Sequence, residues 1–206
     1  TIQFPQIPDA WLDETLAEMY KKFTATVAEV TSGVILPEMV IPASPSYENV
    51  QQFFLEEKNT NENFLKSYKG LNPIKPLSTS SFRLQGENAL LSETKSDALL
   101  KIKLNIDLGE NNGKVTMNPY LSVELDGASN GGFRSAVGNT KYFTINLTGE
   151  PIDVKQVFKK KGDGLTKELY QQIIQIDAFN AALKKIVMEL KEKEKLNTDY
   201  EIVWNL

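Results

Sequence analysis

The side chains that could do chemistry in this 206-residue chain are limited, because the sequence contains no His and no Cys. Cys/His zinc sites, haem–His ligation, iron–sulfur clusters, thiol nucleophiles and His general bases are therefore excluded. A serine activated by a lysine and a pair of carboxylates remain as catalytic options. We expect no tightly bound transition metal and no cofactor. No residue is assigned a catalytic, cofactor-binding or metal-ligating role.

Ser92-Glu93-Thr94-Lys95 has the bare spacing of a serine–lysine pair. It lies on a short amphipathic helix that precedes a strand, so we interpret it as a surface turn. A carboxylate pair of the glycoside-hydrolase type cannot be named in this way, because its two partners meet in space rather than in sequence. With 27 acidic residues, the chain leaves that option open.

The segment from Asp126 to Asn139 is rich in glycine and lies between two predicted strands. A phosphate-binding P-loop instead connects a strand to a helix and ends in Lys followed by Ser or Thr, which is absent here. The Gly-x-Gly-x-x-Gly spacing of dinucleotide-binding folds is also missing. We predict a mobile hairpin loop, with a surface-binding loop as the alternative.

Asp107, Glu110, Asn111 and Asn112 provide oxygen atoms that a calcium ion could use. A calcium loop, however, has acids at alternate positions and a Glu at its twelfth position, and that pattern is absent. Asn112 followed by Gly113 is instead typical of a tight turn with positive φ. We therefore predict a solvated hairpin turn.

Asn146-Leu147-Thr148 is an acceptor for N-glycosylation only in a eukaryotic secretory setting, and we interpret it as solvent-facing strand residues. The net charge of -4 gives no reason to expect nucleic acid or an anionic membrane as partner. No apolar run is long enough to span a bilayer. Thr1 is not an initiator Met, which leads us to expect a processed form.

Alternation with a period of two predicts the strands that carry these segments. The clearest strand runs from Leu100 to Leu108, and its return strand runs from Val115 to Leu125, where Pro119 indicates a sheet edge or a bulge. The other predicted strands are Phe143 to Leu147, Val34 to Ile41 as one or two short strands broken by Pro37, and Tyr200 to Trp204.

Apolar residues at steps of three and four predict the helices. We expect helices from an N-cap at Asp9 to Glu29, from Tyr47 to Glu57, from Gln85 to Thr94 and from Leu165 to Lys195. The last helix should bury its apolar stripe against the sheet; the stripe comprises Leu169, Ile173, Ile176, Phe179, Leu183, Ile186 and Leu190. The fold class is therefore α/β (α+β). We expect one domain over residues 1–206, with a largely antiparallel sheet of about four or five strands packed by N- and C-terminal amphipathic helices.

Three segments resemble a known protein class: Gly33 to Val40, the turn Ser44-Pro45-Ser46-Tyr47, and Ser96-Asp97-Ala98-Leu99-Leu100. They are similar to the strand, the helix start and the helix-to-strand junction of uncharacterised bacterial periplasmic lipoproteins. The last segment is also similar to a signature of the curli-secretion lipoprotein group, whose domains have an anticodon-binding-domain-like α/β fold.

The resemblance implies a non-catalytic lipoprotein domain of the Gram-negative cell envelope, periplasmic or attached to the outer membrane. Such a domain acts in binding or assembly, with a protein or small-molecule partner that the sequence does not identify. It would contact the membrane only through a lipid anchor upstream of Thr1. The alternative is a hydrolase with a carboxylate pair in a cleft. A cleft holding two acids favours the hydrolase, and an exposed apolar patch favours the binding domain.

Overall fold

A computed structural model describes residues 7–51, 66–74, 81–127, 140–157, 165–196 and 204–205. The helices are α1 (Asp9–Thr31), the 3-10 helix η1 (Glu38–Val40), α2 (Tyr47–Val50), α3 (Ser81–Thr94), α4 (Val154–Val157), α5 (Lys167–Ile174) and α6 (Ile176–Leu196). The strands are β1 (Ala98–Asn111), β2 (Lys114–Gly127), β3 (Thr140–Thr148), β4 (Ile152–Asp153) and β5 (Trp204–Asn205).

The five strands form one sheet in the order β1-β2-β3-β5, and β4 pairs with β2 beyond the end of β3. β1 and β2 form a long antiparallel hairpin closed by Asn112 and Gly113, whose φ angles are 50° and 74°. β3 is antiparallel to β2, whereas β5 is parallel to β3. The largely antiparallel sheet and the tight Asn-Gly turn are confirmed.

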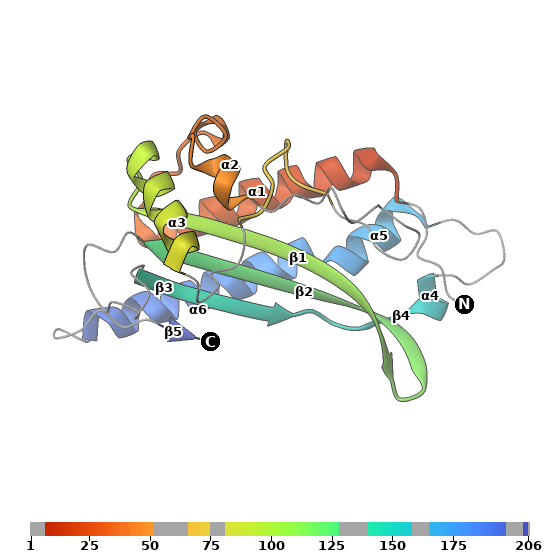
Figure 1. Ribbon diagram of the computed structural model, residues 1–206. Coiled ribbons are helices and arrows are strands. Elements are labelled where there is room, and N and C mark those ends of the chain that lie inside the picture. The colour runs from red at the N-terminus through yellow and green to blue at the C-terminus, as the bar shows by residue number, and fades with distance from the viewer. Residues whose placement is uncertain are drawn as a thin grey trace.

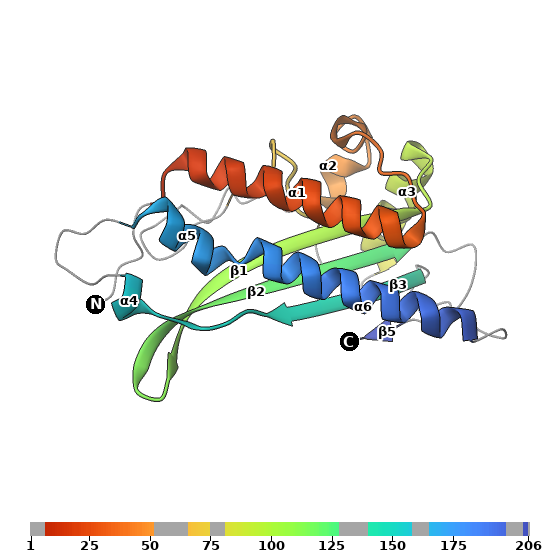
Figure 2. The same ribbon diagram turned by 180° about the vertical axis from the view of Figure 1, so that it is seen from behind.

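The two faces of the sheet are covered differently, as Figures 1 and 2 show from opposite sides. On one face, Leu121, Val123 and Ile145 are fully buried in the main core under α1 and α6. The opposite face is polar along most of its length and is covered at one end by α2 and α3, where Leu90 and Leu91 pack with Leu99. The fold is therefore α+β with helices on both faces, and the predicted packing by the N- and C-terminal helices is confirmed.

Pro119 lies within β2, although a proline cannot donate to a strand ladder. Pairing of β2 with β3 ends at Tyr120, and pairing with β4 begins at Met117. Pro119 occupies the gap between them, where its carbonyl accepts a hydrogen bond of 2.9 Å from the Gly149 N–H. The N–H and C=O of one strand residue point to the same side of the strand. The N–H that Pro119 lacks would therefore point toward Gly149, in the gap where β2 pairs with neither β3 nor β4.

The first helix ends at Thr31, slightly later than the predicted Glu29, and it also begins differently. Ser32 adopts the left-handed conformation with φ of 58°, and the Gly33 N–H closes the helix by bonding to the Ala28 carbonyl. At the other end, Pro8 is the N-cap and makes no side-chain cap, so Asp9 is the first helical residue rather than the predicted cap. A negative side chain there still interacts favourably with the positive end of the helix dipole.

The predicted strand from Val34 to Ile41 is wrong. Residues 34–37 form no regular element, Glu38–Val40 is a 3-10 turn, and the side chains of Val34 and Met39 are 88% and 77% exposed. Pro37 and Pro42 flank the turn and have no N–H to give to a ladder. The apolar β-branched composition that predicted a strand therefore belongs to an exposed connection between α1 and α2.

The long C-terminal helix is two helices. Gln175 separates α5 from α6 with a φ of 55°, a left-handed conformation that ends a helix. Beyond this break, burial of the predicted stripe is confirmed for Ile176, Phe179, Leu183 and Leu190, while Ile186 is half-buried. The sequence pattern missed three buried residues of α5 and α6, which are Tyr170, Ile174 and Val187.

Several predictions concern residues outside the described part of the chain. Only Asp126 and Gly127 of the glycine-rich segment are described, and both belong to β2. The helix predicted from Tyr47 to Glu57 ends at Val50, because Gln51 is extended with ψ of 145° and forms an isolated β-bridge with Ile74. Residues 52–57 lie outside the described residues. A short C-terminal strand is present at Trp204–Asn205, slightly later than predicted.

Candidate functional site

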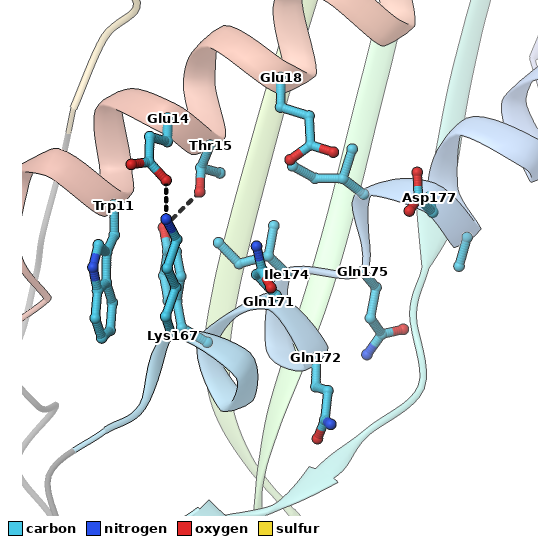
Figure 3. A pocket seen from close by; sticks show the side chains of 13 residues that line it. Trp11, Glu14, Thr15, Glu18, Lys167, Gln171, Gln172, Ile174, Gln175 and Asp177 are labelled. Carbon is cyan, nitrogen blue, oxygen red and sulfur yellow. Dashed lines mark hydrogen bonds and ion pairs between the residues drawn. The ribbon is translucent and has the colours of Figure 1, made fainter.

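A cavity of about 400 Å³ lies between α1, α5 and the first turn of α6. Its walls are held in place by the packing of α1 beside α6, where the Thr26 hydroxyl donates a 2.8 Å hydrogen bond to the Asn180 side chain. Figure 3 shows side chains from both walls pointing toward the space between the helices. The break at Gln175 sets its position, because a continuous helix would place the α5 side chains elsewhere.

One end of the cavity is aromatic. The rings of Trp11 and Tyr170 lie 5.7 Å apart between centroids and are tilted by 35°. The Thr15 hydroxyl donates a 3.1 Å hydrogen bond to the phenolic oxygen of Tyr170. Burial raises the pKa of Tyr170, although the bond from Thr15 opposes this, so the phenol is neutral at physiological pH and can still donate a hydrogen bond.

The charged residues around the cavity are paired with one another. Glu14 forms an ion pair with Lys167, drawn in Figure 3, and Lys22 bridges Glu18 and Asp177. All three carboxylates are open to solvent, and each contacts a lysine ammonium. The general acid of a glycoside hydrolase lies in an apolar enclosure, and these exposed, ion-paired acids have no such enclosure.

The wall formed by the helix break is tied to the sheet. The Gln175 side chain accepts a 2.9 Å hydrogen bond from the Glu150 N–H and donates one of 2.8 Å to the Glu150 carbonyl. A Cβ atom on the adjacent Gly149 would lie 2.7 Å from the Gln175 side-chain oxygen and 2.7 Å from the Pro119 ring. Glycine at this position therefore allows the end of β3 to approach the helix break.

A second polar group is buried under α3, at the end of the sheet away from the hairpin tip. The Lys101 ammonium lies 2.8 Å from Glu87, 2.9 Å from Glu124 and 2.7 Å from Asp126. Glu87 comes from α3, Lys101 from β1, and the other two acids from β2. The side chains of Glu87 and Asp126 are 2% and 1% exposed. We call these four residues the Lys101 cluster.

The Lys101 cluster binds a proton near neutral pH. Burial raises the pKa of Asp126 from 3.8 to about 7, with the hydrogen bond and charge of Glu124 adding to the rise and Lys101 opposing it. Burial lowers the pKa of Lys101, but the charges and hydrogen bonds of Asp126 and Glu87 outweigh this effect and raise it overall. Protonation of Asp126 reduces the excess of negative charge around the single ammonium of the cluster. The cluster does not line the cavity, so among the described residues the buried proton-binding acid and the open pocket are separate.

Register alone could have indicated part of this cluster. Lys101 lies directly opposite Glu124 in the β1–β2 pairing, and Asp126 is two residues further on the same face. A strand that alternates apolar and polar residues usually exposes its polar face to solvent. At this end of the sheet α3 covers that face and buries the Lys101 cluster.

The serine–lysine spacing is a surface turn, as predicted. Ser92 and Lys95 are exposed, and Lys95 has a φ of 54° at the end of α3. Glu93 between them accepts hydrogen bonds from the Ser44 hydroxyl and from the Ser46 N–H and hydroxyl. These bonds lower the pKa of Glu93 and fasten the start of α2 to α3.

The remaining candidate residues are at the surface. Asp107 and Glu110 to Asn112 lie near the tip of the β1–β2 hairpin, which extends beyond the helices in Figure 1. Within the described residues, no group of three or more acidic side chains is placed to hold a metal ion. Asn146 and Thr148 are exposed on β3, as predicted. None of the helices described is long and apolar enough to cross a bilayer.

An exposed apolar segment connects α1 to α2. Beside Val34 and Met39, Ile35 and Leu36 are 40% and 39% exposed. We call residues 34–39, which contain these four side chains, the 34–39 segment.

Comparisons of the chain with models of protein families, with curated proteins and with solved structures found no match.

Proposed function

We propose that this chain is a non-catalytic binding or assembly domain of a Gram-negative cell-envelope lipoprotein, and that its 34–39 segment docks on a protein partner. The exposed apolar residues of that segment are the observation that carries the proposal. Four neighbouring large apolar side chains open to water are unusual in a protein that has no partner for them.

The 34–39 segment is held at both ends. At its start, the Gly33 N–H bonds to the last turn of α1, and after its end Ile41 packs on the α2–α3 cluster. Glu38 within it forms an ion pair with Lys69, whose ammonium also lies 5.2 Å from the centre of the Tyr68 ring. A segment ordered before binding loses less conformational entropy when it docks.

Burial of this segment could supply useful affinity. A fully buried side chain of this size gains about 1.5–3 kcal/mol from the hydrophobic effect. Val34 and Met39, the two most exposed, are therefore the residues expected to contribute most. The gain is reduced by the cost of association, so the segment would form part of an interface rather than the whole of it.

The rival function, a hydrolase with a carboxylate pair in a cleft, has weaker support. The cavity between α1 and α5 holds acids, but lysines pair with them and water reaches them. The acid with a pKa near neutrality, Asp126, is enclosed in the Lys101 cluster. A test is a panel of glycosides with the Glu14→Gln and Glu18→Gln variants. Turnover that disappears in either variant would favour the hydrolase.

The envelope location rests on the resemblance in the segments Ser44 to Tyr47 and Ser96 to Leu100. The coding sequence upstream of Thr1 tests it directly. A signal peptide that ends in a lipid-acceptor Cys supports the proposal, and a leaderless start argues against it.

Docking is tested by site-specific photo-crosslinking in cells of the source bacterium. A photo-reactive amino acid is placed at Val34 or Met39, with Met188, half-exposed on α6, as the matched control. We expect one defined protein adduct at the first two positions and none at Met188. Val34→Ser with Met39→Ser should abolish the adduct formed from a probe at Leu36 without changing the thermal midpoint, because both side chains are exposed. The same adducts at all three positions would contradict the proposal.

A further inference from the structure

We propose that the outer edge of β1 pairs with the β1 edge of a second copy of this chain, antiparallel and centred on Asn105. The pairing would join two sheets into one continuous sheet across a two-fold axis. This inference goes beyond the proposed function and rests on different residues.

β1 is a long edge strand without a proline or a bulge. It is the first strand in the sheet order, so among the described residues only β2 pairs with it. Its register with β2 is unbroken over 14 residues. Edge strands usually avoid pairing through prolines, bulges, short length or charged side chains. Of these features β1 has only the charged side chains, and they carry both signs.

The backbone of β1 limits which registers are possible. The two-residue turn at Asn112 and Gly113 makes Asn111 and Lys114 a hydrogen-bonded pair, so odd-numbered β1 residues bond toward β2. The even-numbered residues then direct their N–H and C=O groups to the free edge. Two copies can exchange these bonds only if even residues face even residues, which places the two-fold axis at a single residue.

Charge favours the register with its axis at Asn105. With the axis at Asn105, Lys103 of each copy lies opposite Asp107 of the other. Both side chains are exposed, and neither forms an ion pair with another described residue. Opposite charges facing each other across strands are stabilising, and like charges are destabilising. An axis at Lys103 would oppose two lysines, and one at Asp107 would oppose two aspartates.

The apolar residues fit the same register. Leu104 would face Ile106 of the second copy, and Ile102 would face Leu108, so the apolar face continues across the axis. Ile102, Leu104 and Ile106 are only partly buried at the border of the main core, and Leu108 is 40% exposed. Lys101 would face Gly109, which leaves the Lys101 cluster undisturbed.

A charge-swap series tests the pairing and its register by sedimentation equilibrium of the full chain. We expect a dimer for the wild type. Lys103→Glu alone and Asp107→Lys alone each create two repulsive pairs, and should raise the dissociation constant by about ten- to a hundredfold. The double variant restores the opposite charges and should restore the dimer. A monomeric wild type, or single and double variants equal to the wild type, would overturn the proposal.

A disulfide test reads the register directly, because the chain has no native Cys. With the axis at Asn105, the Asn105 residues of the two copies face each other as a non-hydrogen-bonded pair. The Cα atoms of such a pair are about 4.5 Å apart, within the range that a disulfide spans. Asn105→Cys should therefore form a covalent dimer under mild oxidation. Asn146→Cys is the matched control, because Asn146 lies on β3 on the same face of the sheet as Asn105 but away from the β1 edge. Equal crosslinking rates in the two variants would refute the proposed register.

Discussion

Replacing Asp126 with asparagine should make the protein more stable at neutral and alkaline pH. The Asp126 side chain is 1% exposed and shares Lys101 with Glu87 and Glu124. Asparagine resembles the protonated acid in shape and can still accept from Lys101. It should therefore keep the geometry of the Lys101 cluster while removing one negative charge that is costly to bury.

The magnitude follows from the pKa of Asp126, which rises from 3.8 in an unfolded chain to about 7 in the fold. A raised pKa means that this carboxyl contributes its stability fully below pH 3.8 and loses it as the pH rises through 7. For these two pKa values, the free energy of unfolding should fall by about 2–3 kcal/mol between pH 5 and pH 8 through this group alone. Asp126→Asn should not show that decrease.

The assay is urea unfolding of both proteins at several pH values from 5 to 8, with Asp97→Asn as the control. Asp97 is exposed and lies outside the Lys101 cluster, so its substitution controls for the loss of a surface carboxylate. The difference between Asp126→Asn and the wild type cancels the contributions of all other titrating groups. If that difference stays constant across the pH range, or if the variant loses stability relative to the wild type as the pH rises, the Lys101 cluster does not hold a proton at Asp126.

Three further substitutions test the packing of the core and the helix break by chemical unfolding. Lys101→Met leaves three carboxylates without their cation and should cost about 3–5 kcal/mol; a neutral effect would contradict the ion-pair geometry. Gly149→Ala places a Cβ 2.7 Å from the Pro119 ring and 3.0 Å from Phe179, and should cost about 1–3 kcal/mol. Gly113→Asn at the hairpin turn should cost less, because a Cβ there meets no atom within 4 Å and Asn tolerates the φ of 74° better than other side chains. Phe179→Ala should cost about 3–5 kcal/mol because the ring is buried in the main core, and a loss below 1 kcal/mol would mean that α6 packs differently.

Local patterns in the sequence were sufficient for the elements whose signals are short in range. The alternation from Leu100 to Leu108 and the Asn112-Gly113 turn fixed the hairpin, because strand pairing across a two-residue turn depends on neighbouring residues. The amphipathic stripe of the C-terminal segment likewise predicted most of the α6 residues that are buried in the main core. The absence of His and Cys excluded whole classes of sites, because those sites require an imidazole or a thiolate whatever the fold.

Only the tertiary structure decided the features that depend on residues far apart in the chain. Gln175 ends a helix whose apolar pattern continues through it, because its side chain binds the backbone of Glu150. The composition of Val34 to Met39 predicts a strand, but no described strand lies beside it to pair with. Its apolar side chains are therefore left exposed to water. Lys101 lies on a face that the sequence marks as polar, and it is buried because α3 crosses that end of the sheet. In each case a long-range contact, which local composition cannot encode, outweighs the local preference.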